Sequence, residues 1–371
     1  MPTLWGKHYT RADLMRRVGH ISQVGGVTLL ESGDGVSRGV RLVEFRTGTG
    51  FQFKVAVERG MDVGHCDYRG QSLAWIPATM LPAPWYFEQQ TAFGWLRGAL
   101  GGLNNSCGMV HIGNPETADV SHYHFPARAQ ETYGVHDRMA LLPGQLVQYG
   151  ERWEGDECIL EAVGRVVQAQ AYGENLILTR RYTARLGESR FFMHDEIENA
   201  GWLPTEHMLL YHINVGFPIV DEGSEQIAPV TQPPAIPDGL PAGEGLDYSR
   251  FIAPQKDWQL QGFELAMASE GDGSVPVGIV NRDNFGIYVI YNQRQFPQYL
   301  EWRMMGEGQY AVGIEPCTNT FGREIARARG QLITLQPGEK RSYDLEVGVL
   351  DGAGAVGAFR DRVQALIAGQ R

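Results

Sequence analysis

The sequence predicts an all-β protein with minor helices, folded as a single domain over residues 1–371. From Val27 onward, short segments rich in Val, Leu, Phe and Tyr alternate with clusters of Gly, Asp, Asn and Pro, which is typical of many-stranded antiparallel sheets. The 47 glycines and 19 prolines supply the turns that such sheets need. A length of 371 residues would also allow two domains, but neither an internal repeat nor a flexible linker divides the chain.

Charge and cysteine usage exclude several classes of protein. A net charge of −11 argues against a nucleic-acid partner, because such proteins present a basic face. The four cysteines contain no C-x-x-C pair, which favours reduced thiols over a zinc knuckle or a disulfide framework. The N-terminus lacks the apolar segment of a signal peptide, and no run of about 18 apolar residues occurs. We therefore expect a soluble, cytoplasmic protein with no membrane partner.

Two helices are predicted, one at each end of the chain. Thr10-Arg11-Ala12-Asp13 has the form of a capping box and predicts a short helix over about residues 10–24, which ends at Gly25-Gly26. Near the C-terminus, apolar residues at helical spacing predict a helix over about residues 355–368. This apolar stripe consists of Val356, Phe359, Val363, Leu366 and Ile367.

The segments between the helices are predicted to be strands. The clearest are Val40–Arg46, Phe51–Glu58, Gln145–Glu151, Cys158–Gln168, Asn175–Ala184, Arg190–Glu198, Pro276–Val280, Gly286–Tyr291, Tyr299–Met304, Tyr310–Ile314, Leu332–Leu335 and Arg341–Val349. Two stretches without a clear period, Met80–Gly108 and Pro229–Asp257, interrupt them. Loops of this length in a compact domain are often functional.

One histidine and one glutamate occur where ionisable groups are unexpected. His212 lies within the apolar run Met208–Val220, and Glu315 follows the apolar residues 311–314. Pro316 is expected to end the strand pairing directly after Glu315. A proton donor and a proton acceptor are the minimum equipment for general acid–base chemistry. The alternative is structural: a hydrogen-bonded core histidine, and a glutamate paired with Arg303 or Arg323.

A histidine cluster offers a metal site as a second hypothesis. His122 and His124 are two residues apart, so on a strand both imidazoles face the same side. With Glu131 and His136 downstream, the set is similar to a cupin metal site, although the spacing is wider and no second half follows. Surface histidines in a loop rich in proline are the alternative.

Arginine and aromatic residues provide candidate binding groups. Arg59 ends a predicted strand just before Gly60, where its planar group of donors can reach a pocket, but it can equally pair with Asp62 in a surface turn. Trp302 and Trp95 can stack on sugar rings or fill the core. The sequence contains no nucleotide-binding loop and no nucleophile elbow.

Five motifs together resemble a known family, and they are ordered along nearly the whole chain. They are Glu58-Arg59-Gly60-Met61-Asp62, Gly134-Val135-His136-Asp137-Arg138, Leu210-Tyr211-His212-Ile213-Asn214-Val215-Gly216-Phe217-Pro218, Glu301-Trp302-Arg303-Met304-Met305 and Val312-Gly313-Ile314-Glu315-Pro316. The chain is similar to the DUF4432 branch of the aldose 1-epimerase (galactose mutarotase-like) superfamily. This resemblance implies a large, twisted antiparallel β-sandwich with a cleft of the size of a sugar.

The resemblance also implies roles for individual residues. In mutarotases, a histidine protonates the ring oxygen while a glutamate takes the proton of the anomeric hydroxyl, and the matching residues are His212 and Glu315. We expect the pair a ring's width apart, with an ionised Glu315 raising the pKa of His212. Substrate contacts are assigned to Arg59, His136, Arg138, Asn214 and Trp302. The reaction requires neither a metal nor an organic cofactor.

Other functions on the same scaffold remain open. A non-catalytic carbohydrate-binding protein would keep Arg59, His136 and Trp302. A metal-dependent isomerase or lyase would use the histidine cluster, and a related enzyme would act on a keto-sugar or an acidic sugar. Asp137 stands where relatives have Gly, which adds a carboxylate beside the cleft. The sequence does not identify the sugar, and a homodimer is one option for the oligomeric state.

Overall fold

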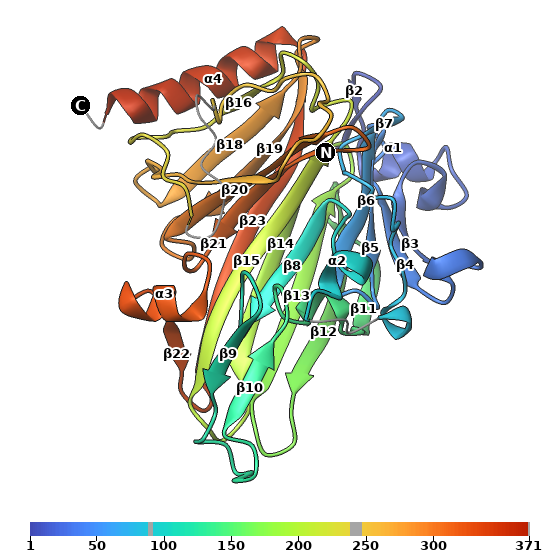
Figure 1. Ribbon diagram of the computed structural model, residues 1–371. Coiled ribbons are helices and arrows are strands. Elements are labelled where there is room, and N and C mark those ends of the chain that lie inside the picture. The colour runs from blue at the N-terminus through green and yellow to red at the C-terminus, as the bar shows by residue number, and fades with distance from the viewer. Residues whose placement is uncertain (88–91, 238–246, 370–371) are drawn as a thin grey trace.

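The structure is a computed structural model that describes residues 1–87, 92–237 and 247–369, and antiparallel strands dominate it (Figure 1). The largest sheet has eight strands in the order β11-β12-β13-β14-β23-β19-β18-β16. They are β11 (Gln145–Glu154), β12 (Glu157–Ala169), β13 (Asn175–Arg185), β14 (Arg190–Asn199), β23 (Lys340–Asp351), β19 (Phe285–Asn292), β18 (Ser274–Val280) and β16 (Glu225–Ile227). All of their pairings are antiparallel.

A six-stranded sheet carries both proton-transfer candidates. Its order is β17-β20-β21-β15-β22, and β8 pairs with β15 as well. The strands are β17 (Gln261–Glu264), β20 (Gln298–Gly306), β21 (Gln309–Cys317), β15 (Thr205–Gly216), β22 (Ile333–Leu335) and β8 (Asn104–Met109). His212 therefore lies in a strand with neighbours on both sides.

A five-stranded sheet and two small ladders complete the β-structure. The five-stranded sheet consists of β3 (Gly26–Glu31), β4 (Arg41–Arg46), β5 (Phe51–Ala56), β6 (Asp62–Tyr68) and β7 (Gln71–Ser72), in chain order. The ladders pair β1 (Thr3–Leu4) with β2 (Lys7–His8), and β9 (Glu116–Asp119) with β10 (Gln130–Tyr133).

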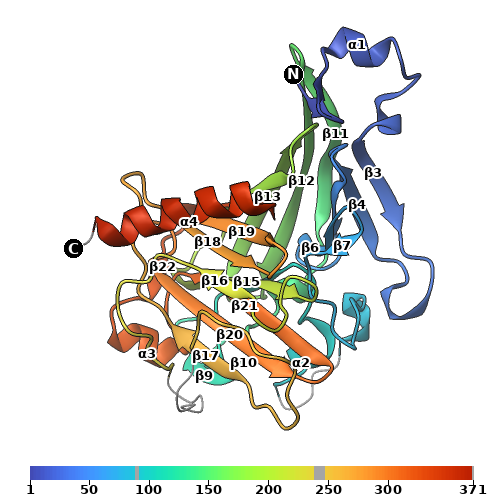
Figure 2. The ribbon, with the colours of Figure 1, turned by 90° about the horizontal axis from the view of Figure 1, so that it is seen from above.

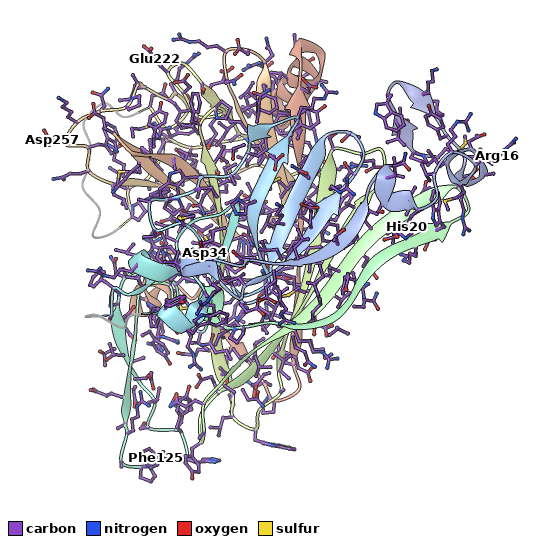
Figure 3. The ribbon with its side chains drawn as sticks, turned by 90° about the vertical axis from the view of Figure 1, so that its right-hand side faces the viewer. Arg16, His20, Asp34, Phe125, Glu222 and Asp257 are labelled. Carbon is purple, nitrogen blue, oxygen red and sulfur yellow. The ribbon has the colours of Figure 1, made fainter. Side chains whose placement is uncertain are left out.

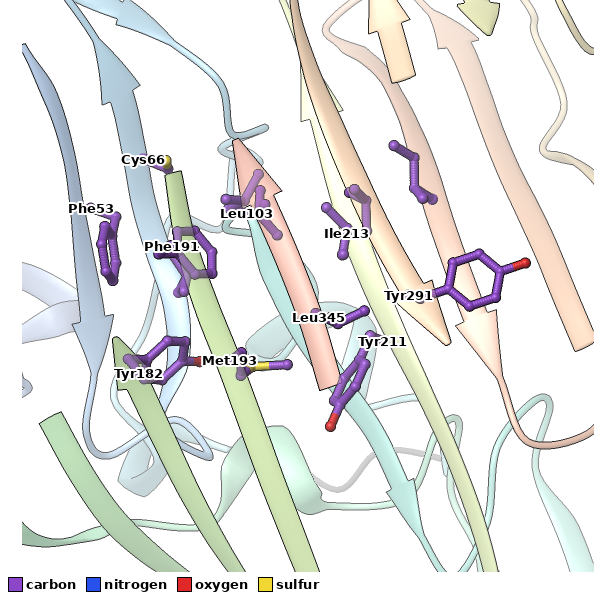
Figure 4. Close-up of a cluster of buried hydrophobic side chains, with 14 of the residues drawn as sticks. Phe53, Cys66, Leu103, Tyr182, Phe191, Met193, Tyr211, Ile213, Tyr291 and Leu345 are labelled. Carbon is purple, nitrogen blue, oxygen red and sulfur yellow. The ribbon is translucent and has the colours of Figure 1, made fainter. Parts of the chain in front are cut away.

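The eight-stranded sheet packs against both of the other large sheets. On one half, Phe53 of β5 packs against Phe191 of β14, with ring centroids 4.5 Å apart and the rings tilted by 32°. On the other half, the ring centroid of Tyr291 of β19 lies 6.0 Å from that of Tyr299 of β20. Figure 4 shows this continuous layer of side chains between the sheets, including Tyr211 of β15. The predicted antiparallel β-sandwich is thus confirmed.

The expected N-terminal helix is shorter than predicted. Helix α1 spans only Arg11–Met15, and a single 3-10 turn, η1, follows at Ile21–Gln23. The Thr10–Asp13 capping box is present at its start. Gly19, a poor helix former, lies between the two pieces. Figure 3 places Arg16 and His20 of this segment at one extremity of the molecule, away from the labelled Phe125 and Asp257.

The C-terminal helix forms as expected, as α4 (Ala353–Ala368). It buries Val356, Phe359 and Val363 against the eight-stranded sheet, whose outer face it crosses in Figure 2. Two short helices escaped prediction, α2 (Trp95–Gly98) and α3 (Arg323–Ala328). Other single 3-10 turns are η2 (Gly35–Ser37), η3 (Pro84–Tyr86) and η4 (Met139–Leu141). None of the helices in the described ranges has the length and apolarity needed to cross a bilayer.

The predicted strands all appear, most with ends shifted by a few residues. For example, the expected Gln145–Glu151 extends to Glu154 in β11, and Phe51–Glu58 ends at Ala56 in β5. The first aperiodic stretch contains helix α2 and nearly all of strand β8, which was not predicted. The described part of the second contains only isolated bridges, and residues 88–91 and 238–246 lie outside the described residues. The second stretch is anchored by Arg303, which donates to the carbonyls of Asp247 (2.7 Å) and Arg250 (3.0 Å).

Candidate active site

Strand register brings His212 and Glu315 together. Strands β15 and β21 pair at Leu210 with Cys317 and at Ile213 with Ile314, and this single register places His212 directly opposite Glu315. The imidazole Nε2 lies 3.1 Å from Oε1 of Glu315. The two groups are therefore in direct contact, and not a ring's width apart as expected.

Pro316 does not end the strand pairing, which corrects the prediction. Pairing with β15 lapses next to Pro316 and resumes at Cys317, while on the other side Pro316 lies opposite Tyr299 of β20. The missing N–H thus removes only the nearest ladder contacts. The gap falls at the level of His212 and Glu315.

Alternation along β15 explains why the run around His212 looks uniformly apolar. Tyr211 and Ile213 point into the core between the sheets, as Figure 4 shows. Met208 and Leu210 belong to a second buried cluster on the opposite face, which is also the face of His212. Both faces of the strand are covered, so an ionisable residue within the run Met208–Val220 is unusual.

A cavity of about 680 Å³ opens onto this second face. Four of the predicted site residues line it: His136, His212, Trp302 and Glu315. The ring of Trp302 lies 5.3 Å from that of His212 and 5.6 Å from that of Trp75, which also lines the cavity. The polar groups are thus surrounded by aromatic walls, as in ligand sites generally.

His136 approaches the pair from a loop. Its backbone adopts the left-handed region with a φ of 52°, and its ring lies 6.1 Å from His212 and 4.7 Å from Trp95. The N–H of Gly113 donates to its Nδ1 at 3.3 Å. Burial, and secondarily His212, hold the pKa of His136 well below its ordinary value. The ring is neutral, so its proton resides on Nε2.

Apart from its 3.1 Å contact with His212, Glu315 is a buried carboxyl group without a polar partner in the described part of the chain. Neither of its oxygens is satisfied within the described residues, and its exposed fraction is 0%. Burial raises its pKa to about 8, with a smaller contribution from Glu301. Glu315 does not pair with Arg303 or Arg323, the structural alternative considered from the sequence. Arg303 pairs with Glu301 at 3.2 Å, and Arg323 pairs with Glu206.

His212 is shifted in the opposite direction. Burial lowers its pKa to about 4, and the side chain of Asn214 opposes this change. Its Nδ1 is buried without a hydrogen-bond partner in the described part of the chain. Desolvation therefore outweighs the mutual attraction that the sequence led us to expect. Between these pKa values the pair holds one proton, and the neutral arrangement places it on Glu315.

Asn214 stands behind His212 and does not line the cavity. Its side-chain nitrogen donates to the carbonyls of Gly102 (3.0 Å) and His212 (3.1 Å). This residue is thus placed to hold the strand and the loop together, and its predicted contact with substrate has no geometric support.

The two arginines expected to bind substrate lie elsewhere. Arg59 is buried and donates to the carbonyls of Pro82 (3.0 Å), Gly98 (2.7 Å) and Ala99, which fixes the segment that carries Trp95. Arg138 donates to the carbonyl of Ala169 at 2.9 Å.

Arg138 and Asp137 both line a separate cavity of about 520 Å³. There the carboxylate of Asp137 accepts a hydrogen bond of 2.6 Å from Gln168. Burial raises the pKa of Asp137 to about 7. The extra carboxylate in this motif therefore lies beside the cleft of His212, and not in it.

The proposed metal ligands are not brought together. His122 and His124 are exposed, Glu131 accepts from Arg128 at 2.6 Å, and His136 lies in the cleft. Across residues 1–87, 92–237 and 247–369, no three His, Cys, Asp or Glu side chains are arranged to hold a metal ion. The histidine cluster therefore does not fit a metal centre.

Sequence reasoning missed most of the other lining residues, among them Trp75, Asn114 and Phe321. Each comes from a loop, and the ring of Phe321 lies 5.8 Å from His136. Asn114 sits between Gly113 and Pro115, a turn signal that points to a loop but not to its neighbours.

The fold is that of galactose mutarotase-like proteins. A candidate aldose 1-epimerase from Klebsiella pneumoniae superposes with a TM-score of 0.80 at 20% identity, over 92% of this chain and 87% of that chain. A galactose mutarotase-like protein from Clostridium acetobutylicum gives 0.61 at 13% identity, covering 88% and 99%. A galactose 1-epimerase from Lactobacillus acidophilus gives a TM-score of 0.56 at 12% identity, over 88% of this chain and 99% of that chain.

Within this fold, the chain belongs to the family described as domain of unknown function DUF4432, whose model matches residues 37–349. Among proteins with curated descriptions, none matches the chain.

Proposed function

We propose that this protein is a sugar mutarotase of the aldose 1-epimerase type. The observation that carries the proposal is the contact of 3.1 Å between His212 and Glu315, two buried groups with one proton between them, in an aromatic-walled cavity. The names of the fold neighbours, an aldose 1-epimerase candidate and a galactose 1-epimerase, support the same chemistry. Polarimetry on freshly dissolved single anomers tests it directly.

The contact between the two groups suits the geometry of ring opening. The ring oxygen and the anomeric hydroxyl are bonded to the same carbon, so the groups that serve them must be neighbours. Glu315 donates its proton to the ring oxygen as the bond from that oxygen to the anomeric carbon breaks. His212 Nε2 takes the proton of the anomeric hydroxyl as the aldehyde forms, which leaves an ion pair in place of two neutral groups.

Closure reverses these transfers after the aldehyde has rotated. The ring hydroxyl attacks the aldehyde carbon and returns its proton to Glu315, while His212 protonates the new anomeric oxygen. The roles are inverted relative to those implied by the family resemblance, because burial favours a protonated Glu315 and a neutral His212. The number of protons on the pair is the same in both assignments.

Other residues of the cleft would bind the sugar. His136 presents its Nε2 proton as a donor to a hydroxyl, since its Nδ1 is occupied by Gly113. The faces of Trp302 and Trp75 offer a surface for the C–H face of the ring. A non-catalytic binding protein would have no use for a buried carboxyl group whose one polar contact among the described residues is with a buried histidine, which favours the enzyme over that alternative.

The pH dependence of kcat/KM is expected to be bell-shaped. Below about pH 4 His212 becomes protonated, so the pair holds two protons and has no base. Above about pH 8 Glu315 loses its proton, so the pair has no acid, and activity falls on both sides. Rates measured by polarimetry from pH 3 to 10, after subtraction of the buffer-catalysed rate, are about tenfold lower one unit beyond each limit. A flat profile across pH 6 to 10 contradicts the assignment.

Replacing Trp302 with Ala is expected to weaken substrate binding. Loss of one stacking face raises KM about tenfold, with a smaller effect on kcat, because the acid–base pair remains. Trp202→Ala is the matched control, since Trp202 is 90% exposed on the loop between β14 and β15. Equal KM values for the two variants would remove Trp302 from the binding site.

A further inference from the structure

Among the residues that the structure describes, no cationic side chain lines the cleft of His212 and Glu315. Of the described residues that line it, none is Lys or Arg, and its acidic residues are Glu301, Glu307 and Glu315. The segments 88–91 and 238–246, which the structure does not describe, also lack Lys and Arg in their sequences. Phosphate and carboxylate groups on ligands are ordinarily held by Arg or Lys. A sugar phosphate or sugar acid would find no such partner here.

The cleft is polar at its base, and most of the rest of its lining is apolar, although Thr79, Asn114, Glu307 and Gln309 also line it. The base consists of His136, His212 and Glu315, with exposed fractions of 8%, 4% and 0%. At the mouth, Phe93 is 47% exposed and Leu96 is 50% exposed. Further apolar lining comes from Pro77, Ala78, Leu100, Leu260, Met304 and Phe321. These side chains offer a ligand no hydroxyl or amide partner.

The volume also exceeds what a simple monosaccharide fills. A cavity of about 680 Å³ has the size of the pockets that enclose drug-sized molecules, roughly 300–1,000 Å³, and a single hexose is considerably smaller. If the anomeric carbon lies against His212 and Glu315, the opposite side of the ring, with carbons 3 and 4, faces the mouth. Phe93 and Leu96 line the mouth together with the exposed polar residues Asn114, Glu307 and Gln309.

We propose that the ligand is an uncharged reducing sugar that carries an apolar substituent on the side of the ring opposite the anomeric carbon. The inference rests on the proposed function for the orientation of the ring, and it adds the class of substrate. Phe93 and Leu96 would cover the substituent, and the absence of cations would exclude phosphorylated and acidic sugars. It also argues against the acidic sugar considered from the sequence.

A matched series of sugars tests the proposal. D-Glucose and D-galactose are compared with their 3-O- and 4-O-benzyl and 3-O- and 4-O-carboxymethyl ethers, which leave the anomeric centre free. Dissociation constants from calorimetry report ligand class, and polarimetry reports mutarotation. In at least one series the benzyl ether is expected to bind at least about tenfold tighter than the parent sugar, and the carboxymethyl ether about tenfold weaker.

The two readouts separate the two claims. Any other order of affinities, or binding of none of these sugars, overturns the inference about substrate class. If the expected order holds but no sugar is interconverted faster than in buffer, the mutarotase function fails and the ligand class stands. If both hold, the benzyl ether also has the highest kcat/KM.

A gain of charge at the mouth provides a second test. Leu96→Arg supplies the missing cation, so the affinity for the carboxymethyl ether relative to the benzyl ether is expected to rise by about tenfold or more. Leu30→Arg is the matched control, because Leu30 lies on β3 and does not line the cleft. If Leu96→Arg leaves the ratio as unchanged as the control does, the ring is not oriented as proposed.

Discussion

Replacing His212 with Asn, or Glu315 with Gln, is expected to lower kcat by about 10²- to 10⁴-fold, the usual contribution of a positioned acid or base. Each change keeps the approximate shape of the side chain and removes its ability to exchange a proton. Because one group cannot complete the transfer without the other, the double variant is expected to be little worse than either single variant. Polarimetry measures kcat for the three variants and the unmodified protein with the same sugar.

Controls for these variants carry the same chemical changes at the surface. His194→Asn and Glu196→Gln alter exposed or half-buried residues of β14, and both are expected to retain full activity. Unfolding curves establish that all four proteins are folded. If either His212→Asn or Glu315→Gln retains the unmodified rate, the proposed acid–base pair is wrong.

Replacing Arg180 with Met is expected to destabilise the protein by about 3–5 kcal/mol, the cost of breaking a buried ion pair. Arg180 lies on β13 and is fully buried. It donates to both carboxylate oxygens of Asp195 (2.8 and 2.6 Å) and to Asp62 (2.6 Å). Met fills a similar volume but leaves two carboxylates without their cation. Denaturant unfolding measures the loss.

The adjacent residue is the control for this prediction. Arg181 points to the other face of β13, where its half-exposed side chain pairs with Glu161. Arg181→Met is therefore expected to cost less than about 1 kcal/mol. If Arg180→Met unfolds at the same denaturant concentration as Arg181→Met, the buried cluster does not stabilise the fold. If Arg180→Met gives no soluble protein while Arg181→Met does, the direction of the prediction is met.

The sequence singled out His212 and Glu315, the proposed acid–base pair, because ionisable residues are unusual where these two occur. Strand β15 is covered on both faces, so an ionisable residue in it was conspicuous, and the same holds for Glu315 in β21. Nothing local could indicate that burial would reverse the expected pKa shifts, since desolvation depends on what surrounds the pair. Their direct contact follows from a strand register that only the folded sheet defines.

Predictions based only on what a side chain is able to bind were less successful. An arginine beside a turn can reach a pocket, yet Arg59 is enclosed by backbone carbonyls of two other segments, and no local pattern distinguishes these outcomes. Helix α3 was missed because six residues form too short a window for helical periodicity. Trp75 and Phe321 reach the cleft through loops, whose positions depend on the packing of the sheets.

His212 and Glu315 are carried by neighbouring strands of one sheet, and this has a consequence for how much the cleft changes when a ligand leaves it. A slip of β21 by one residue would turn Glu315 into the hydrophobic interior and Ile314 out of it, so every apolar contact of the strand opposes it. The reactive geometry thus inherits the rigidity of the sandwich. We expect the amides of Ile213 and Ile314 to exchange with deuterium only through global unfolding, whether or not sugar is present.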